Sequence, residues 1–132
     1  MNTGKTGIGR FFKGFVYAFE GVVSCIKTER NMRFHIGVAV LVILLMRFYG
    51  LSAAETAAVY ICIGLVISLE LVNTAVEAAV DMACKDKNPL AKKAKDCAAG
   101  AVLLAAIVSV AVGIRIFWDY YAFMAIASYF AR

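Results

Sequence analysis

Residues 97–114 read CAAGAVLLAAIVSVAVGI, which is a run of eighteen consecutive residues without a single charge. A run of this length and composition is long enough to cross the hydrocarbon core of a bilayer as a helix. The whole 132-residue chain has the same character, because 63% of it is hydrophobic and only 17% is charged. Soluble domains run nearer ~45–50% apolar and ~25% charged, so the composition excludes an ordinary cytosolic enzyme.

The N-terminal part of the chain predicts two different relations to a membrane. Residues 9–32 combine aromatic and charged side chains at helical spacing, which predicts an amphipathic helix on the membrane surface. Residues 34–49 are apolar apart from His35 and Arg47, and they predict a short first span.

Two longer helices are expected after this first span. Residues 53–83 predict a second span, which begins with a capping box formed by Ser52 and Glu55. Residues 90–116 contain the uncharged run and predict the third span. The Asn-Pro pair at 88–89 predicts its start, with the asparagine as cap and the proline at the first helical position.

Basic residues predict the orientation of these spans. Eleven of the fourteen fall in two regions, which are Lys5, Arg10, Lys13, Lys27, Arg30 and Arg33, and then Lys85, Lys87, Lys92, Lys93 and Lys95. Three spans put both regions on one side of the membrane, and the positive-inside rule makes that side the cytoplasm. The aromatic tail, residues 117–132, then lies at the outer interface. The net charge of +5 is read as an orientation signal and an attraction to anionic lipid, and no nucleic acid partner is expected.

One face of the second span carries the groups that indicate chemistry. Glu70, Asn73, Glu77 and Asp81 are three or four residues apart and therefore share a helix face. Ionisable groups inside a membrane are expensive and by default indicate a functional site. Three neighbouring carboxylates repel one another, which either raises their pKa values or requires a cation, for which Mg²⁺ and nearby lysines are candidates. The alternative is a polar packing stripe or solvated carboxylates, and for Asp81 the two interpretations are equally good.

Two further polar clusters face the same side. Lys95 and Asp96 open the third span, and Arg33 lies in the stretch that joins the surface helix to the first span. Lys95 and Arg33 are equally well read as ordinary anchors to the membrane surface. His35 is better read as an interfacial histidine than as a catalyst. The four cysteines are widely spaced, without a CxxC pair, and predict free thiols.

Two stretches, ELVNTAVEAAVD at 70–81 and AKDCAAGAVL at 94–103, closely resemble the signature of the prokaryotic diacylglycerol kinase family. The resemblance covers about residues 9–116. It implies a homotrimer with active sites built between subunits, which transfers the γ-phosphate of Mg-ATP to a lipid hydroxyl.

The resemblance also implies roles for individual residues. Glu70 looks like the general base that takes the proton from the lipid alcohol, and Glu29 and Glu77 look like the Mg²⁺ ligands. The positions that match the family's nucleotide site are Arg10, Tyr17, Glu29, Asn73, Glu77, Asp86, Asn88, Lys95 and Asp96.

Departures from the Gram-negative members bear on the lipid. Those members carry serine where this chain has Ala18 and Ala99, so Ala99 joins Glu70 on the expected lipid side. The pattern Asn31-x-Arg33-x-His35 looks more like the Gram-positive branch, which phosphorylates undecaprenol. Undecaprenol is therefore favoured over diacylglycerol.

The sequence thus predicts an all-α lipid kinase that spans the bacterial cell membrane, with its active site facing the cytoplasm. A small proton or cation transport protein that uses the intramembrane carboxylates is the alternative from another class. The transport hypothesis accounts for Glu70 and Glu77 but not for the lysine-rich loop and Glu29 on the same side. A purely structural oligomer is disfavoured by the cost of the acidic stripe.

Overall fold

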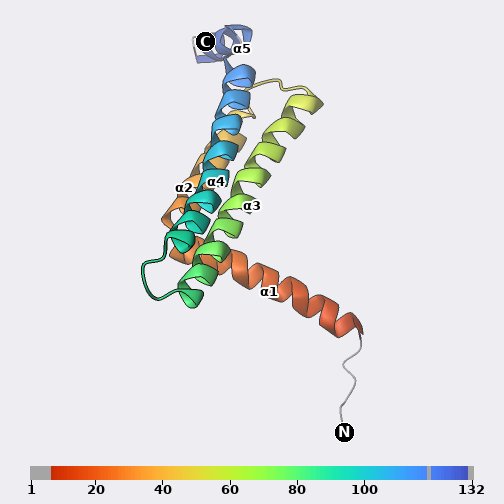
Figure 1. Ribbon diagram of the computed structural model, residues 1–132. Helices are drawn as coiled ribbons and strands as arrows, with labels where there is room; N and C mark the ends of the chain where they lie inside the picture. The colour runs from red at the N-terminus through yellow and green to blue at the C-terminus, as the bar shows by residue number, and fades with distance from the viewer. Residues whose placement is uncertain (1–6, 119, 131–132) are drawn as a thin grey trace.

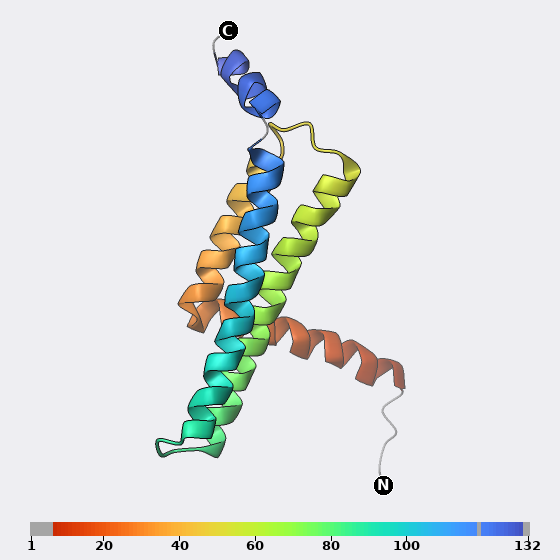
Figure 2. The same cartoon turned by 45° about the horizontal axis from the view of Figure 1, so that its top comes forward.

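The computed structural model describes residues 7–118 and 120–130, and the described residues form five helices and no strand (Figure 1). The helices are α1 (Gly7–Thr28), α2 (Arg30–Leu45), α3 (Ala53–Ala83), α4 (Pro89–Phe117) and α5 (Tyr120–Phe130). Helices α2, α3 and α4 form a bundle. Helix α1 projects sideways from the bundle, nearer the end that holds the α3–α4 loop. Helix α5 lies at the opposite end (Figure 2).

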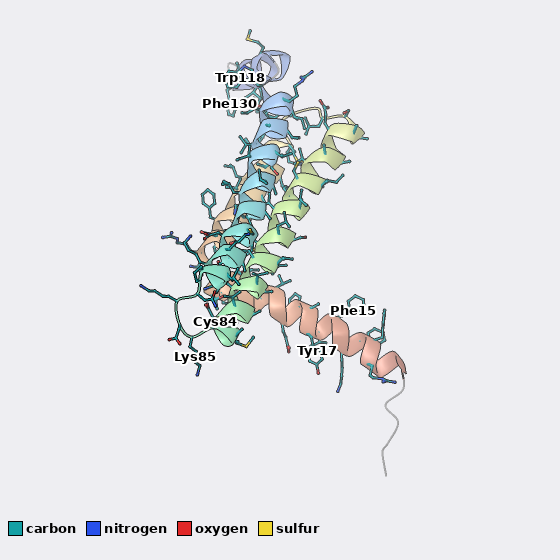
Figure 3. The ribbon with its side chains drawn as sticks, in the orientation of Figure 1. Phe15, Tyr17, Cys84, Lys85, Trp118 and Phe130 are labelled. Carbon is teal, nitrogen blue, oxygen red and sulfur yellow. The ribbon has the colours of Figure 1, made fainter. Side chains whose placement is uncertain are left out.

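The order of the helices places the basic regions as the sequence predicted. The chain runs along α2, returns along α3 and runs back along α4, so α1 and the loop 84–88 lie toward the same end (Figure 1). The loop 46–52 and α5 lie at the other end. In the predicted aromatic tail, Trp118 and Phe130 are exposed at this opposite end (Figure 3). Lys5 and Arg132 lie outside the described residues.

Two helices are long and apolar enough to cross a membrane. Helix α3 has 31 residues and α4 has 29, and only 22% and 11% of their most apolar windows are buried in the structure. Helix α2 has sixteen residues, which is about 24 Å of helix and shorter than the ~30 Å hydrocarbon core. The chain exposes 10389 Å², against about 6800 Å² for a compact soluble monomer of this mass. Much of this surface therefore needs lipid or protein to cover it.

The predicted surface helix ends earlier than the sequence suggested. The segment 9–32 was expected to be one helix, but the chain breaks at Glu29, whose backbone is extended. Residues 30–32 therefore belong to α2. The physical reason is a side chain from the next helix, since the Arg33 guanidinium donates to the carbonyl oxygen of Lys27 at 2.9 Å. This bond satisfies a carbonyl that the broken helix leaves without an amide partner.

Both predicted helix starts are confirmed. The Ser52 hydroxyl accepts from the backbone amide of Glu55 at 3.3 Å, and the Glu55 carboxylate accepts from the amide of Ser52 at 2.9 Å. At the start of α4, the side-chain oxygen of Asn88 accepts from the amide of Leu90 at 2.8 Å. Pro89 is the first residue of that helix.

The buried core is small and lies mainly between α3 and α4. Its members on these two helices are valine and alanine residues, namely Val59, Val66, Val102 and Ala105. Beside it, α2, α3 and α4 enclose an apolar groove of about 530 Å³ that extends from Phe34 and His35 to Phe117 and Trp118. All four cysteines are free, and Cys25 is buried.

Candidate active site

The polar stripe on α3 changes from buried to exposed along the helix. Glu70 is 3% exposed and Asn73 is 7% exposed, and they are the two buried polar residues in the part of the chain that the structure describes. Glu77 is half-buried and Asp81 is exposed. Burying a carboxylate is costly unless the site offers compensating partners. The burial of Glu70 thus sets it apart from ordinary solvated carboxylates.

Asn73 links the buried part of the stripe to Glu77. Its amide nitrogen donates to Oε1 of Glu77 at 3.2 Å. Its amide oxygen is buried and has no hydrogen-bond partner among the residues that the structure describes. A buried polar atom without a partner costs about 1–3 kcal/mol, so it points to a missing ligand, water or ion. An oxygen donor next to a carboxylate is suited to a hard cation.

Helix α1 packs against α3 at the level of this stripe. The buried Cys25 thiol lies 3.2 Å from the Thr74 hydroxyl, which donates to the carbonyl oxygen of Glu70 at 3.0 Å. Glu70 is one helical turn from this contact, toward the middle of α3. Glu77 and Asp81 lie on the other side of it, toward the loop 84–88. The Cys25–Thr74 contact therefore separates the buried Glu70 from the more exposed Glu77 and Asp81.

Glu29 reaches the same region from the corner between α1 and α2. It is half-buried, and its Oε1 accepts from the Thr28 hydroxyl at 3.0 Å. Glu29, Glu77 and His35 are near enough to act electrostatically on the Glu70 carboxyl. The tertiary structure therefore brings together carboxylates that are more than forty residues apart in the chain.

Helix α4 adds two lysine–aspartate pairs at this end of the bundle. Nζ of Lys95 lies 2.6 Å from Oδ1 of Asp81, which ties α4 to α3. Lys92 pairs with Asp96 one turn along α4. These partners are largely exposed, so each pair contributes little to the free energy of unfolding.

Other predicted nucleotide residues do not join this cluster within one chain. Tyr17 is 65% exposed and lies on the part of α1 that stands away from the bundle (Figure 3). Arg10 lies still farther toward the start of that helix. Asp86 is exposed in the loop 84–88. The Asn88 side chain is used as the α4 cap, and Ala99 is exposed on α4.

No ready-made metal cage is present in the described residues. Within 7–118 and 120–130, no group of three or more His, Cys, Asp or Glu side chains could hold a metal ion. Mg²⁺ is usually bound in nucleotide sites by one or two carboxylates together with phosphates and water. Glu29, Glu77 and the unpaired oxygen of Asn73 supply the oxygen donors that such a site needs.

Two supporting residues were missed by sequence reasoning. Cys25 and Thr74 were not assigned a role, although their contact joins α1 to the polar stripe. The available signal was position, because Thr74 is four residues from Glu70 and therefore adjacent to it on the helix surface. Cys25 gave no such signal, since its neighbours in the fold come from a distant part of the chain.

Comparisons with known proteins identify the family of this chain. A family model for prokaryotic diacylglycerol kinase matches residues 16–117. Undecaprenol kinase of Bacillus subtilis is 44% identical over 113 residues, which cover 86% of this chain and 92% of that protein. Diacylglycerol kinase of Synechocystis is 47% identical over 100 residues, which cover 75% of this chain and 57% of that protein. Diacylglycerol kinase of Escherichia coli is 30% identical over 122 residues, covering 92% and 99%. The chain belongs to the prokaryotic diacylglycerol kinase family.

Proposed function

We propose that this lipid kinase transfers the γ-phosphate of ATP to the hydroxyl of undecaprenol, at the end of the bundle where α1 meets α3. The observation that carries the proposal is the burial of Glu70 and Asn73 beside Glu29 and Glu77. A stripe that is buried on one side of the α1 contact and exposed on the other suits a reaction between a lipid and a water-soluble nucleotide. Family membership supports the same activity. Nothing in the family or the relatives supports the transport alternative.

Glu70 acts as the general base in this proposal. Its carboxylate takes the proton of the lipid hydroxyl, and the hydroxyl oxygen forms a bond to the γ-phosphorus. The bond between that phosphorus and the bridging oxygen breaks, and ADP leaves. Glu70 is the most buried carboxylate of the stripe and lies on the side of the Cys25–Thr74 contact toward the middle of α3, which supports this role. Phosphoryl transfer needs mainly positioning and charge neutralisation from the rest of the site.

Glu29 and Glu77 hold Mg²⁺ in the proposed site. When bound, the ion neutralises negative charge on the phosphates. Both carboxylates are half-buried, and Glu77 accepts a hydrogen bond from Asn73. The unpaired oxygen of Asn73 is a further oxygen donor beside them. A pair of carboxylates is sufficient for Mg²⁺ that is shared with a nucleotide.

Lys95, Asp96 and Asn73 contact the phosphates and nucleotide in this proposal, and Asp86 and Asn88 are the loop contacts. Lys95 supplies positive charge next to the stripe. Arg10 and Tyr17 lie on the part of α1 that stands away from its own bundle, so we assign them to the site of a neighbouring copy. A homotrimer with sites built between subunits would bring them to the nucleotide. The large exposed surface of the chain, 10389 Å², supports such an assembly.

The chain crosses the bacterial cell membrane three times in this proposal, with the active site in the cytoplasm. Helix α2 is short, but three of the four residues after it are also hydrophobic, with Arg47 as the exception, so the stretch extends to Tyr49. The basic residues of α1 and of the loop 84–88 lie toward one end of the bundle, as the positive-inside rule requires of a cytoplasmic face.

Cysteine labelling tests this topology. In a background without native cysteines, a membrane-impermeant maleimide should label Ala54→Cys on intact cells and Lys87→Cys only after the cells are opened. Both positions are exposed in the structure, so labelling reports sidedness. Labelling of both positions on intact cells would contradict three spans.

A kinase assay tests the function itself. Purified protein in detergent micelles is given Mg-ATP with undecaprenol or with diacylglycerol, and the phosphorylated lipid is measured. We expect transfer to undecaprenol to be the faster reaction, because the undecaprenol kinase of Bacillus subtilis is 44% identical over 86% of this chain, whereas the diacylglycerol kinase of Escherichia coli is 30% identical. Faster transfer to diacylglycerol would reverse the choice of lipid. Absence of transfer to both would refute the proposed reaction.

A further inference from the structure

The Arg33 side chain forms hydrogen bonds across the corner between α1 and α2. Helix α1 ends at Thr28, and the extended backbone of Glu29 prevents the next turn from forming. The last carbonyls of a helix have no intrahelical amide partners. The Arg33 guanidinium takes the place of these missing donors. Its Nη1 lies 2.9 Å from the carbonyl oxygen of Lys27 and 3.4 Å from that of Ile26. Because Arg33 belongs to α2, these bonds fix the end of α1 relative to the start of α2.

Glu29 is the residue whose position this corner determines. Its amide donates to the carbonyl oxygen of Cys25 at 2.8 Å, and its own carbonyl accepts from the amide of Arg33 at 3.4 Å. Its side chain accepts from the Thr28 hydroxyl at 3.0 Å. Glu29 is therefore attached to the end of α1 and to the start of α2. A change in the angle between those helices moves its carboxylate.

We propose that Arg33 is a positioning residue for Glu29: by capping the last carbonyls of α1 it holds the Glu29 carboxylate where Mg²⁺ binds. This inference rests on the proposed role of Glu29 as a metal ligand. Residues that orient a metal ligand typically change metal affinity or activity by about 10–100-fold when they are substituted. The residue type fits, because a guanidinium is planar, always charged and carries several donors. A cation is also favoured at a helix C-terminus.

Arg33→Gln tests the proposal, with Arg30→Gln as the matched control. Arg30 is also exposed and lies three residues away in the same basic cluster, so both variants lose one positive charge at the same end of α2. The full-length protein is used in detergent with undecaprenol. Hydrogen exchange of the amides from 26 to 33 reports the corner without metal or nucleotide. Turnover as a function of free Mg²⁺, and Mn²⁺ binding measured by electron paramagnetic resonance, report the metal site.

We expect exchange at the corner to accelerate about tenfold in Arg33→Gln, as for the loss of a hydrogen bond to a charged donor. The half-saturating Mg²⁺ concentration should rise about 10–100-fold, with Mn²⁺ affinity falling to match, and turnover at saturating Mg²⁺ should be largely retained. Arg33→Lys keeps the charge and one donor, so its half-saturating concentration should fall between those of Arg33→Gln and the unmodified protein. Arg30→Gln should resemble the unmodified protein in all measurements.

Three results would overturn the positioning role. Unchanged exchange at the corner would show that Arg33 does not cap α1. Unchanged Mg²⁺ and Mn²⁺ dependence despite faster exchange would show that Arg33 caps α1 but does not affect the metal site. Weaker ATP binding in the absence of metal would show that Arg33 contacts phosphate directly. If Arg33→Gln loses helical content, Arg33→Lys becomes the test of the positioning role. The half-saturating Mg²⁺ concentration of Arg33→Lys must then be higher than that of the unmodified protein.

Glu29→Gln separates this inference from the proposed function. If Glu29→Gln leaves the Mg²⁺ dependence unchanged, the assignment of Glu29 as a metal ligand is wrong. The exchange measurement on Arg33→Gln would still report the cap in that case. If Glu29→Gln weakens Mg²⁺ binding and Arg33→Gln does not, only the positioning role fails.

Discussion

The two halves of α3 bury the same number of residues, but one half buries apolar residues and the other buries polar ones. The half nearer the loop 46–52 buries Val59 and Val66, and the half nearer the loop 84–88 buries Glu70 and Asn73. Burial of a valine side chain in a soluble protein contributes about 1.5–3 kcal/mol to stability, whereas burial of a carboxylate is costly without partners. The apolar half therefore supports the fold, and the polar half carries the residues of the proposed active site.

The surroundings of the two halves differ in the same way. The apolar half borders the groove of about 530 Å³ between α2, α3 and α4, which is lined almost entirely by apolar side chains. The polar half meets α1 and the corner at Glu29, where hydrogen bonds and charged groups gather. Substitutions in the polar half should therefore change activity, and substitutions in the apolar half should change stability.

The largest expected effect is that of Glu70→Gln. A general base contributes typically ~10²–10⁴-fold to rate, so turnover at saturating Mg-ATP and lipid should fall by about that factor. Folding and ATP binding should largely survive, because glutamine keeps the volume and can still form hydrogen bonds. Turnover is measured beside a separate ATP-binding isotherm.

Glu55→Gln is the matched control for Glu70→Gln, because it makes the same substitution at the other end of α3. Glutamine can also complete a capping box, so helix α3 should keep its start and the enzyme its turnover. Near-normal turnover in Glu70→Gln would refute the role of base. Loss of ATP binding together with turnover would instead make Glu70 a metal ligand.

Glu77→Gln should have the next largest effect, and on a different quantity. Removal of a metal ligand should weaken Mg²⁺-dependent ATP binding by at least the ~10–100-fold typical of residues that only support a ligand. Calorimetric titration with ATP at several Mg²⁺ concentrations measures this effect. Glu20→Gln, at an exposed position on α1, is the control and should leave binding unchanged. Equal affinities in the two variants would exclude Glu77 from the metal site.

Ser52→Ala tests the apolar half by removing the cap of α3. Loss of an N-cap typically costs ~1 kcal/mol, so the free energy of unfolding in detergent should fall by about this amount. The Michaelis constants for ATP and lipid should not change, since the cap lies at the end of α3 opposite Glu77. Denaturation in mixed micelles gives the stability and initial rates give the constants. A change in the Michaelis constant for ATP would contradict the division between the two halves.

Asp81→Asn should have the smallest effect. Asp81 pairs with Lys95, but the two side chains are 65% and 35% exposed, so the pair should contribute less than about 1 kcal/mol to stability. The same denaturation measurement applies. A loss of turnover as large as that of Glu70→Gln would show that the pair belongs to the reacting groups and is more than a link between α3 and α4.

Much of the local structure could be predicted because its causes are local in the chain. The start of α3 follows from a serine and a glutamate three residues apart, and the start of α4 follows from an Asn-Pro pair. The polar stripe follows from helical spacing of Glu70, Asn73 and Glu77. The resemblance of residues 70–81 to the family motif gave these three residues their expected roles in catalysis and in metal and nucleotide binding.

The break at Glu29 could not be predicted in this way. The aromatic and charged pattern continues smoothly through residues 9–32, and neither proline nor glycine marks an end near Glu29. The helix ends there because Arg33, a residue of the following helix, supplies the hydrogen bonds that another turn would have supplied. Such a cap exists only once both helices are in place.

The sequence by itself determined that the chain is all-helical, where α3 and α4 begin, which segments are apolar enough to lie in a bilayer, and which face of α3 carries carboxylates. Hydrophobic periodicity and capping residues act over a few neighbouring positions, so they can be read directly. Only the tertiary structure decided that Glu70 and Asn73 are buried while Asp81 is exposed. Burial depends on how the other helices pack against α3, and the Cys25–Thr74 contact, between residues 49 apart, shows that no local pattern encodes such packing.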